Sequence, residues 1–209
     1  MWSDLALPWQ LAFSQAWKAY CAGSYPIGAV LLDEHGEVLT TGRNHVNDAD
    51  GEPGEITFNQ FAHAESNALI KAAQLDKEIL HRSVLYTTLE PCPMCMGIFY
   101  MSGVRELHYA ARDPYAGSAD MIGTSWYLSL KPIKVFAPQD TGLEAISIAM
   151  NVQNMLANYP EAHRISIFER WREIHPRGVE LGEKWFKQGF LTKMANRHLP
   201  FAEVFDQLK

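Results

Sequence analysis

Helical and extended patterns of apolar residues alternate over the first half of the chain. Residues 9–21 carry apolar side chains at helical spacing, and a Gly and a Pro end that pattern. Two short apolar runs follow, over residues 27–32 and 38–41, and the turn residues between them predict a β-hairpin. The next segment, residues 44–59, is a polar loop, and an irregular connection of this length usually bears on function.

The alternation continues to about residue 159. It predicts further elements in this order: a helix over residues 62–74, a strand over 84–88, a helix opened by Pro91 and stopped by Gly103, a strand over 106–111, a strand over 133–136 and a helix over 143–159. Strands that alternate with helices form parallel pairs in a sheet that the helices cover. Residues 1–159 are therefore predicted to be one layered α/β unit.

The last part of the chain, residues 160–209, is predicted to be a helical extension with a boundary at Pro160. Apolar spacing indicates one helix that ends at Ile174 and a second helix that follows Pro176 and continues through Met194. The aromatic residues of this extension are most simply a packing face. A lid over an active site and a dimer contact are the alternatives.

Composition and charge narrow the class of protein. The chain has 209 residues, of which 47% are hydrophobic and 20% are charged, so disorder, collagen and coiled coil are excluded. The net charge is −6, and it is divided into −8 over residues 1–160 and +2 over residues 161–209. An acidic body does not favour a nucleic-acid polyanion as partner, and a small or neutral substrate fits it better.

Two features bear on the compartment in which the protein works. No stretch approaches the roughly 18 uninterrupted apolar residues of a membrane span, and residues 1–4 lack the basic start of a secretory signal, which predicts a cytoplasmic protein. The three cysteines are an odd number, and Cys92 and Cys95 lie three apart, which indicates metal or redox chemistry in a reducing compartment. Cys21 is expected to be a core residue of the first helix.

The candidate chemistry lies in two short segments, each at the start of a predicted helix. His63 and Glu65 are in the first segment, and Cys92 and Cys95 are in the second. Cysteines at i and i+3 share a helical face, so two sulfurs and one imidazole can hold a single zinc ion. Three protein ligands leave a fourth position for water, which is typical of a catalytic zinc. Glu65 is not needed as a ligand and can carry protons, so the set indicates hydrolytic deamination.

These motifs resemble the zinc-dependent cytidine and deoxycytidylate deaminase superfamily, whose signature is His-x-Glu followed by Pro-Cys-x-x-Cys. Further segments are similar to the branch that contains tRNA adenosine deaminase, guanine deaminase and fungal-type cytosine deaminase: residues 25–30, 42–44, 85–92 and 110–113. The resemblance covers about residues 8–159. It implies a three-layer α/β/α fold with a mixed five-stranded sheet and, commonly, a homodimer.

The resemblance also implies a role for individual residues. It makes His63, Cys92 and Cys95 the zinc ligands, and it makes Glu65 the group that moves protons from water to the leaving amine. Asn44 and the backbone amide of Ala64 match groups that bind the substrate ring. On chain position alone, Asn44 is also suited to be a turn residue after the preceding strand.

The expected substrate is a small nucleobase or nucleoside. One alternative is a tRNA-specific adenosine deaminase, for which basic residues in 161–209 would supply a patch for phosphates. Another is a deaminase fold that binds nucleotides without catalysis. A redox pair and a purely structural zinc are less favoured, because His63 and Glu65 complete the deaminase motif and no fourth ligand is evident in the sequence.

Overall fold

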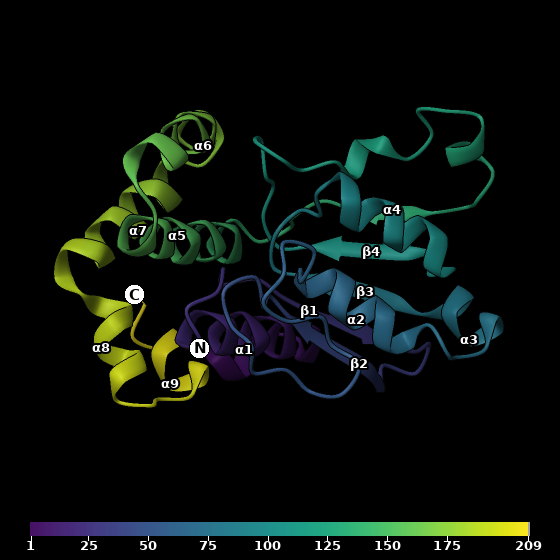
Figure 1. Cartoon of the computed structure of the whole chain (residues 1–209), viewed down its shortest axis with the longest axis horizontal. Helices are drawn as coiled ribbons and strands as arrows, with labels where there is room; N and C mark the ends of the chain where they lie inside the picture. Colours follow the sequence, from purple (N-terminus) through teal and green to yellow (C-terminus); the bar gives the residue numbers. More distant parts are fainter. Residues whose placement is uncertain (209) are drawn as a thin grey trace.

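Five short strands form one mixed sheet in the computed structural model, which describes residues 1–208 (Figure 1). In chain order they are β1 (Gly28–Leu32), β2 (Val38–Arg43), β3 (Val84–Thr87), β4 (Glu106–Tyr109) and β5 (Lys134–Phe136). Their order across the sheet is β2-β1-β3-β4-β5. Strand β1 is antiparallel to β2 and β3, whereas β3, β4 and β5 are parallel, so the predicted mixed sheet is confirmed.

Helices cover both faces of this sheet. Helix α1 (Leu7–Cys21) packs against β1, β2 and β3 on one face, and α2 (Ala64–Ala72) and α4 (Pro93–Ser102) share a hydrophobic core with the strands on the other. All five residues of β1 are buried, because its alternate side chains face helices on both sides. The predicted three-layer α/β/α fold is therefore confirmed.

Short elements and helix ends differ from the sequence prediction. Helix α4 begins at Pro93 and not at Pro91, because Cys92 caps the helix and Pro93 takes its first position. Three short helical turns and helix α3 (Lys77–Arg82) were not predicted, since they are too short to show a periodic pattern. Cys21 is exposed at the last position of α1, so the prediction that it belongs to the core is wrong.

The part of the chain after β5 is helical, and its helices lie beyond one end of the sheet (Figure 1). They are α5 (Thr141–Asn158), α6 (Glu161–Ile174), α7 (Pro176–Gln188), α8 (Phe190–Asn196) and α9 (Phe201–Phe205). The prediction of one continuous helix after Pro176 is wrong. Gly189 adopts a left-handed conformation with φ of 60° and separates α7 from α8.

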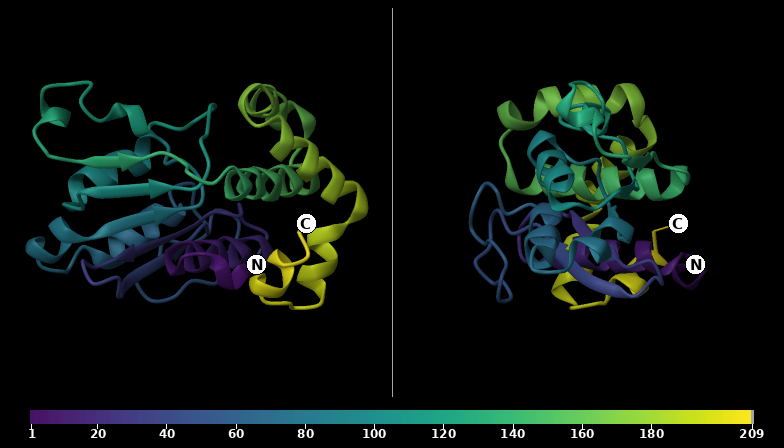
Figure 2. Two further views of the ribbon diagram at one scale, coloured as in Figure 1. Left: turned by 180° about the vertical axis from the view of Figure 1, so that it is seen from behind. Right: turned by 90° about the vertical axis from the view of Figure 1, so that its right-hand side faces the viewer.

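The extension shares its core with the rest of the protein. Trp185, Leu191 and Phe201 pack in one cluster with Phe13 and Trp17 of α1. Helix α7 lies so close to α5 that a Cβ atom on Gly182 would be 2.6 Å from Cβ of Val152. Figure 2 shows the last helices folded back beside the N-terminus. No helix within residues 1–208 is long and apolar enough to cross a membrane.

Candidate active site

The candidate site lies at one edge of the sheet, where several strands end or begin. The carboxyl ends of the parallel strands β3 and β4 meet there, and the register of β1 with β2 and β3 brings the start of β1 and the end of β2 to the same edge. Asn44 directly follows β2, Cys92 comes soon after β3, and Asp113 comes soon after β4. This edge is where open α/β sheets bind ligands.

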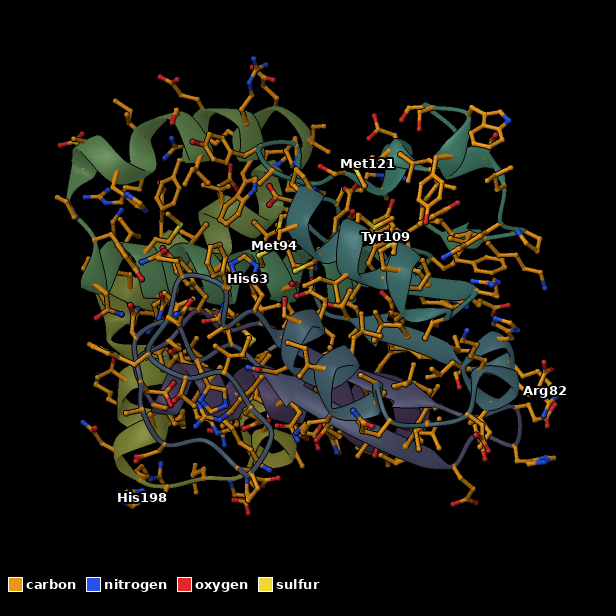
Figure 3. The ribbon with its side chains drawn as sticks, turned by 45° about the vertical axis from the view of Figure 1, so that its right-hand side comes forward. His63, Arg82, Met94, Tyr109, Met121 and His198 are labelled. Atoms are coloured by element: carbon orange, nitrogen blue, oxygen red, sulfur yellow. The ribbon has the colours of Figure 1, made fainter. Side chains whose placement is uncertain are left out.

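Two helix N-termini bring the predicted metal ligands together. His63 is the N-cap residue of α2, and Cys92 is the N-cap residue of α4. Cys95 lies in the first turn of α4, on the same side as Cys92. Figure 3 labels His63 at the start of α2 and Met94 in the first turn of α4. Unpaired amide groups at helix N-termini favour negatively charged thiolates, so both helices support the ligand set.

The three side chains have the spacing that a zinc ion requires. Nδ1 of His63 lies 3.6 Å from Sγ of Cys92 and 3.5 Å from Sγ of Cys95. A zinc ion with Zn–N of about 2.1 Å and Zn–S of about 2.3 Å at tetrahedral angles places N and S about 3.6 Å apart. The ligand atoms of all three residues lie within 4.8 Å of one another. His63, Cys92 and Cys95 therefore fit a zinc ion with one position left for water.

The pKa values of the two thiols are shifted in opposite directions. A hydrogen bond from Cys95, together with the neighbouring His63, lowers the pKa of Cys92 to about 4. The pKa of Cys95 is raised, chiefly because its thiol donates that bond and because it is buried. A zinc ion bound here would take both sulfurs as thiolates.

Glu65 lies beside the metal ligands and is almost fully enclosed, with 4% of its surface exposed. One carboxylate oxygen accepts a hydrogen bond of 3.4 Å from the Thr87 hydroxyl, and the other lies 3.6 Å from Sγ of Cys95. Burial raises the pKa of Glu65, since it disfavours the charged carboxylate. A carboxyl group with a raised pKa next to a metal site is suited to accept and return a proton.

The structure also places Asn44 and Ala64 at this site. The side-chain oxygen of Asn44 accepts a hydrogen bond of 3.0 Å from the amide of Val46, so it makes a turn, and its NH₂ group is the part left to act as a donor. Ala64 is the first residue of α2, where backbone amides have no partner inside the helix. Gly42 lets β2 approach this point, because a Cβ atom there would lie 2.1 Å from the carbonyl oxygen of Ala64.

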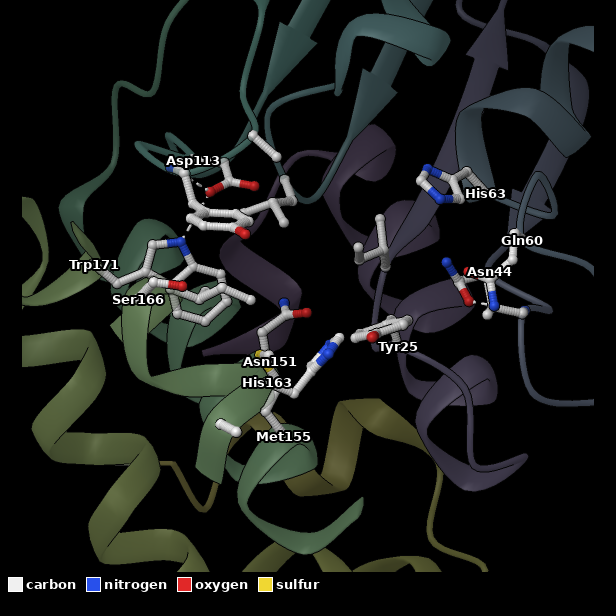
Figure 4. A pocket seen from close by; sticks show the side chains of 17 residues that line it. Tyr25, Asn44, Gln60, His63, Asp113, Asn151, Met155, His163, Ser166 and Trp171 are labelled. Carbon is white, nitrogen blue, oxygen red and sulfur yellow. Dashed lines mark hydrogen bonds between the residues drawn. The ribbon is translucent and has the colours of Figure 1, made fainter. Parts of the chain in front are cut away.

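A cavity of about 500 Å³ extends from His63 to the C-terminal helices. His63, Asn44 and Gln60 line one end of it, and Asp113 and Trp171 line the other (Figure 4). The wall between them comes from α5 and α6, which contribute these residues: Asn151, Met155, Ala162, His163, Ser166 and Ile167. Helix α6 of the extension is therefore part of the site.

The residues of this second wall were not predicted from the sequence, although a lid over an active site was one alternative for the extension. Asn151, His163 and Ser166 are spaced along predicted helices in a way that does not differ from a packing or solvent face. The aromatic residues of the extension do pack, since Phe168 and Trp171 are buried. Trp171 also reaches the cavity, and that contact depends on a chain fold that no local pattern contains.

Comparison with known proteins agrees with the arrangement of the metal ligands. The sequence model of the cytidine and deoxycytidylate deaminase zinc-binding region matches residues 5–111, which is just over half of the chain. The chain belongs to this family of zinc-binding deaminases. The matched region contains His63, Glu65, Cys92 and Cys95, whereas α5 to α9 lie outside it.

Individual relatives of this deaminase family differ in their substrates. The chain is 36% identical over 107 residues to the tRNA-specific adenosine deaminase of Bacillus subtilis. This alignment covers 51% of the present chain and 61% of the relative. It is 35% identical over 95 residues to the guanine deaminase of the same organism, and this match covers 45% of the present chain and 55% of the relative. Two tRNA(Ile)-lysidine synthases from Deinococcus species also match, and the chain covers only 17% and 21% of their lengths.

Solved structures of the family share the fold. The guanine deaminase of Nitrosomonas europaea aligns with a TM-score of 0.54 and 25% identity, and the alignment covers 70% of this chain and 82% of that one. The relatives therefore establish a zinc-binding deaminase fold.

Proposed function

We propose that the chain is a hydrolytic deaminase that uses zinc to replace the exocyclic amine of a small nucleobase or nucleoside with oxygen and releases ammonia. The observation that carries this proposal is the buried carboxylate of Glu65 beside a His–Cys–Cys set of ligands at the end of a cavity. A purely structural metal site does not need such a carboxylate or such access.

Each residue at the end of the cavity has a chemical task in this proposal. A zinc ion held by His63, Cys92 and Cys95 supplies an activated water molecule when bound. Glu65 would accept a proton from the attacking water and pass it to the ring nitrogen next to the reacting carbon. It would then take up the proton of the new hydroxyl group on that carbon and deliver it to the departing amine. The NH₂ group of Asn44 and the amide of Ala64 donate hydrogen bonds that orient the ring.

The walls of the cavity favour a small uncharged substrate over tRNA. No Lys or Arg side chain is among the residues 1–208 that line it, and Asp113 adds an acidic group. The basic residues of the extension are partly neutralised, since Arg170 bonds to Glu173 and Arg172 bonds to Glu183. A tRNA substrate needs cations along its phosphates. The relatives that act on tRNA make it the second candidate, and a binding protein without catalysis is the third.

The homodimer and the cytoplasmic location remain predictions. A groove between α2 and α4 exposes apolar side chains, among them Ile70 and Met101, and it supports association of two copies. Light scattering of the zinc-loaded protein tests the dimer. A mass of about 24 kDa, equal to that of the single chain, would contradict it.

Ammonia release tests the proposed function directly. Zinc-loaded protein is incubated with cytosine, adenine, guanine, their nucleosides and bulk tRNA. The variant Glu65→Gln is expected to bind zinc and to lose turnover, because the amide cannot carry the proton. Glu203→Gln is the matched control, since Glu203 is exposed on α9. Full activity in Glu65→Gln would refute the assignment.

A further inference from the structure

The far end of the cavity has its own set of polar groups. When a planar ring lies against His63 and Asn44, the space between α5, α6 and the segment after β4 lies beyond that ring (Figure 4). Asn151, Asp113, His163 and Ser166 line this outer compartment. Asn151, His163 and Ser166 lie outside the matched family region, and Asp113 lies two residues beyond its end, in a segment that resembles the deaminase branch.

Asn151 presents an acceptor to the compartment. Its side chain is 2% exposed, and its NH₂ group donates a hydrogen bond of 2.9 Å to the carbonyl oxygen of Ser147. This bond fixes which end of the amide is oxygen, because a carbonyl accepts only from the nitrogen. Among residues 1–208 no donor bonds to the oxygen of Asn151, and Figure 4 shows the side chain directed into the cavity. This oxygen faces the cavity, where water or an O–H or N–H group of a ligand can donate a hydrogen bond to it.

Asp113 presents a second acceptor across the compartment. One of its oxygens accepts hydrogen bonds from the indole of Trp171 at 2.9 Å and from the amide of Tyr115 at 3.0 Å. The amide of Asp113 itself donates to Glu90 at 3.0 Å, so both the backbone and the side chain are held in place. The second carboxylate oxygen is left for a ligand. It can accept a hydrogen bond from a hydroxyl group, whereas its negative charge repels phosphate.

Contacts at both ends of α6 fix it over the compartment. Near its start, the ring of Tyr159 stacks on Tyr25 at 5.1 Å, and its hydroxyl accepts a hydrogen bond of 2.7 Å from Asn47. Near its end, Trp171 bonds to Asp113, and His175 lies 3.0 Å from the carbonyl oxygen of Arg112. These partners are far apart in the sequence, so α6 is a fixed wall and not a loosely attached appendage.

We propose that the outer compartment binds the sugar of a nucleoside, with Asn151 and Asp113 accepting hydrogen bonds from its hydroxyl groups. The proposal rests on the deaminase function proposed above, and it narrows the substrate to an uncharged nucleoside. A free base makes neither hydrogen bond, and a nucleotide brings phosphate to a wall that has an acidic residue and no Lys or Arg within residues 1–208.

The test compares each base with its own nucleoside. For cytosine, adenine and guanine, kcat/KM is measured for the free base, the nucleoside and the nucleoside 5′-monophosphate. Wild-type protein is expected to prefer one nucleoside at least about tenfold over both other forms, the loss expected for one unmade hydrogen bond to a buried group. A base or a monophosphate that reacts as well as its nucleoside would overturn the proposal, and so would turnover confined to tRNA.

Two variants assign the effect to the compartment. Asn151→Ala is expected to lower kcat/KM for the nucleoside about tenfold, mainly through KM, and to leave the base within about twofold. Asn158→Ala on the same helix is the control, because Asn158 is exposed. In Ser166→Leu, the larger side chain fills the compartment from an exposed position on α6. We expect this variant also to lower kcat/KM for the nucleoside, and it alters no buried residue. Equal losses on base and nucleoside in both variants would overturn the proposal.

Calorimetry separates this proposal from the deaminase function. Zinc-loaded Glu65→Gln is titrated with the same bases and nucleosides, so that binding is measured without turnover. Tighter binding of a nucleoside than of its base supports the sugar compartment, even if the wild type releases no ammonia and the deaminase function fails. Equal or weaker binding of every nucleoside refutes the compartment even if a free base is deaminated.

Discussion

The close packing of α7 on α5 gives a quantitative prediction. Helix α6 connects these two helices and covers the cavity. Gly182 faces α5, and a Cβ atom at this position would lie 2.6 Å from Cβ of Val152 and 2.7 Å from the carbonyl oxygen of Ala149. These distances are about 1 Å shorter than an ordinary contact between carbon atoms. The change Gly182→Ala therefore forces the two helices apart.

The expected cost follows from two opposing effects. Overpacking of a well-packed contact costs about 1–3 kcal/mol, and contact with a backbone oxygen places this case near the upper end. Alanine gains about 1 kcal/mol over glycine in the interior of a helix. We expect Gly182→Ala to lower the free energy of unfolding by about 2 kcal/mol, the difference between these two effects.

Gly178 on the same helix is the matched control. A Cβ atom there would lie 2.9 Å from Cβ of Ile148 and 3.2 Å from the carbonyl oxygen of Ala145, so the strain is smaller. Gly178→Ala is expected to change the free energy of unfolding by less than about 1 kcal/mol. Urea unfolding followed by circular dichroism measures both variants. A Gly182→Ala protein as stable as the wild type, or less affected than Gly178→Ala, would refute the close packing of α5 and α7.

Three further predictions concern the loop after β2, the metal and the substrate ring. Burial alone would raise the pKa of Asp48, but hydrogen bonds from groups that include Ser24 and Arg43 lower it below its usual value. Asp48→Asn should therefore cost about 1–3 kcal/mol at pH 7, and in thermal unfolding this difference should shrink as the pH falls below about 4. Zinc at about 100 times its Kd should stabilise the metal-free protein by about 2.7 kcal/mol, and a similar shift in His63→Ala would contradict the ligand set. Asn44→Ala should lower kcat/KM about tenfold for base and nucleoside alike, and an effect confined to nucleosides would place Asn44 at the sugar.

The sheet and the helices that cover it were predictable because their patterns are local. The runs at β1 and β3 are apolar and short, and the periodic segment of α2 is bounded by a polar loop. The break at Gly189 was not predictable, because the apolar spacing continues across it from α7 into α8. A single glycine in a helical pattern is also compatible with an unbroken helix.

The candidate site was predictable only at one end. Two cysteines three apart and a His–x–Glu motif carry their chemistry in the sequence, and the structure brings these side chains together. The other end depends on contacts between distant segments, such as the bond between Trp171 and Asp113, 58 residues apart. Asn151 gives no signal in the sequence, since its importance comes from burial at a cavity wall.

The most direct test of the central claim is ammonia release by zinc-loaded protein from matched bases and nucleosides, with Glu65→Gln as the blank. We expect one nucleoside to be deaminated, Glu65→Gln to bind it without turnover, and added salt to have little effect on the rate. Activity that persists in Glu65→Gln, or turnover of tRNA alone with a steep dependence on salt, would contradict the proposed deaminase function.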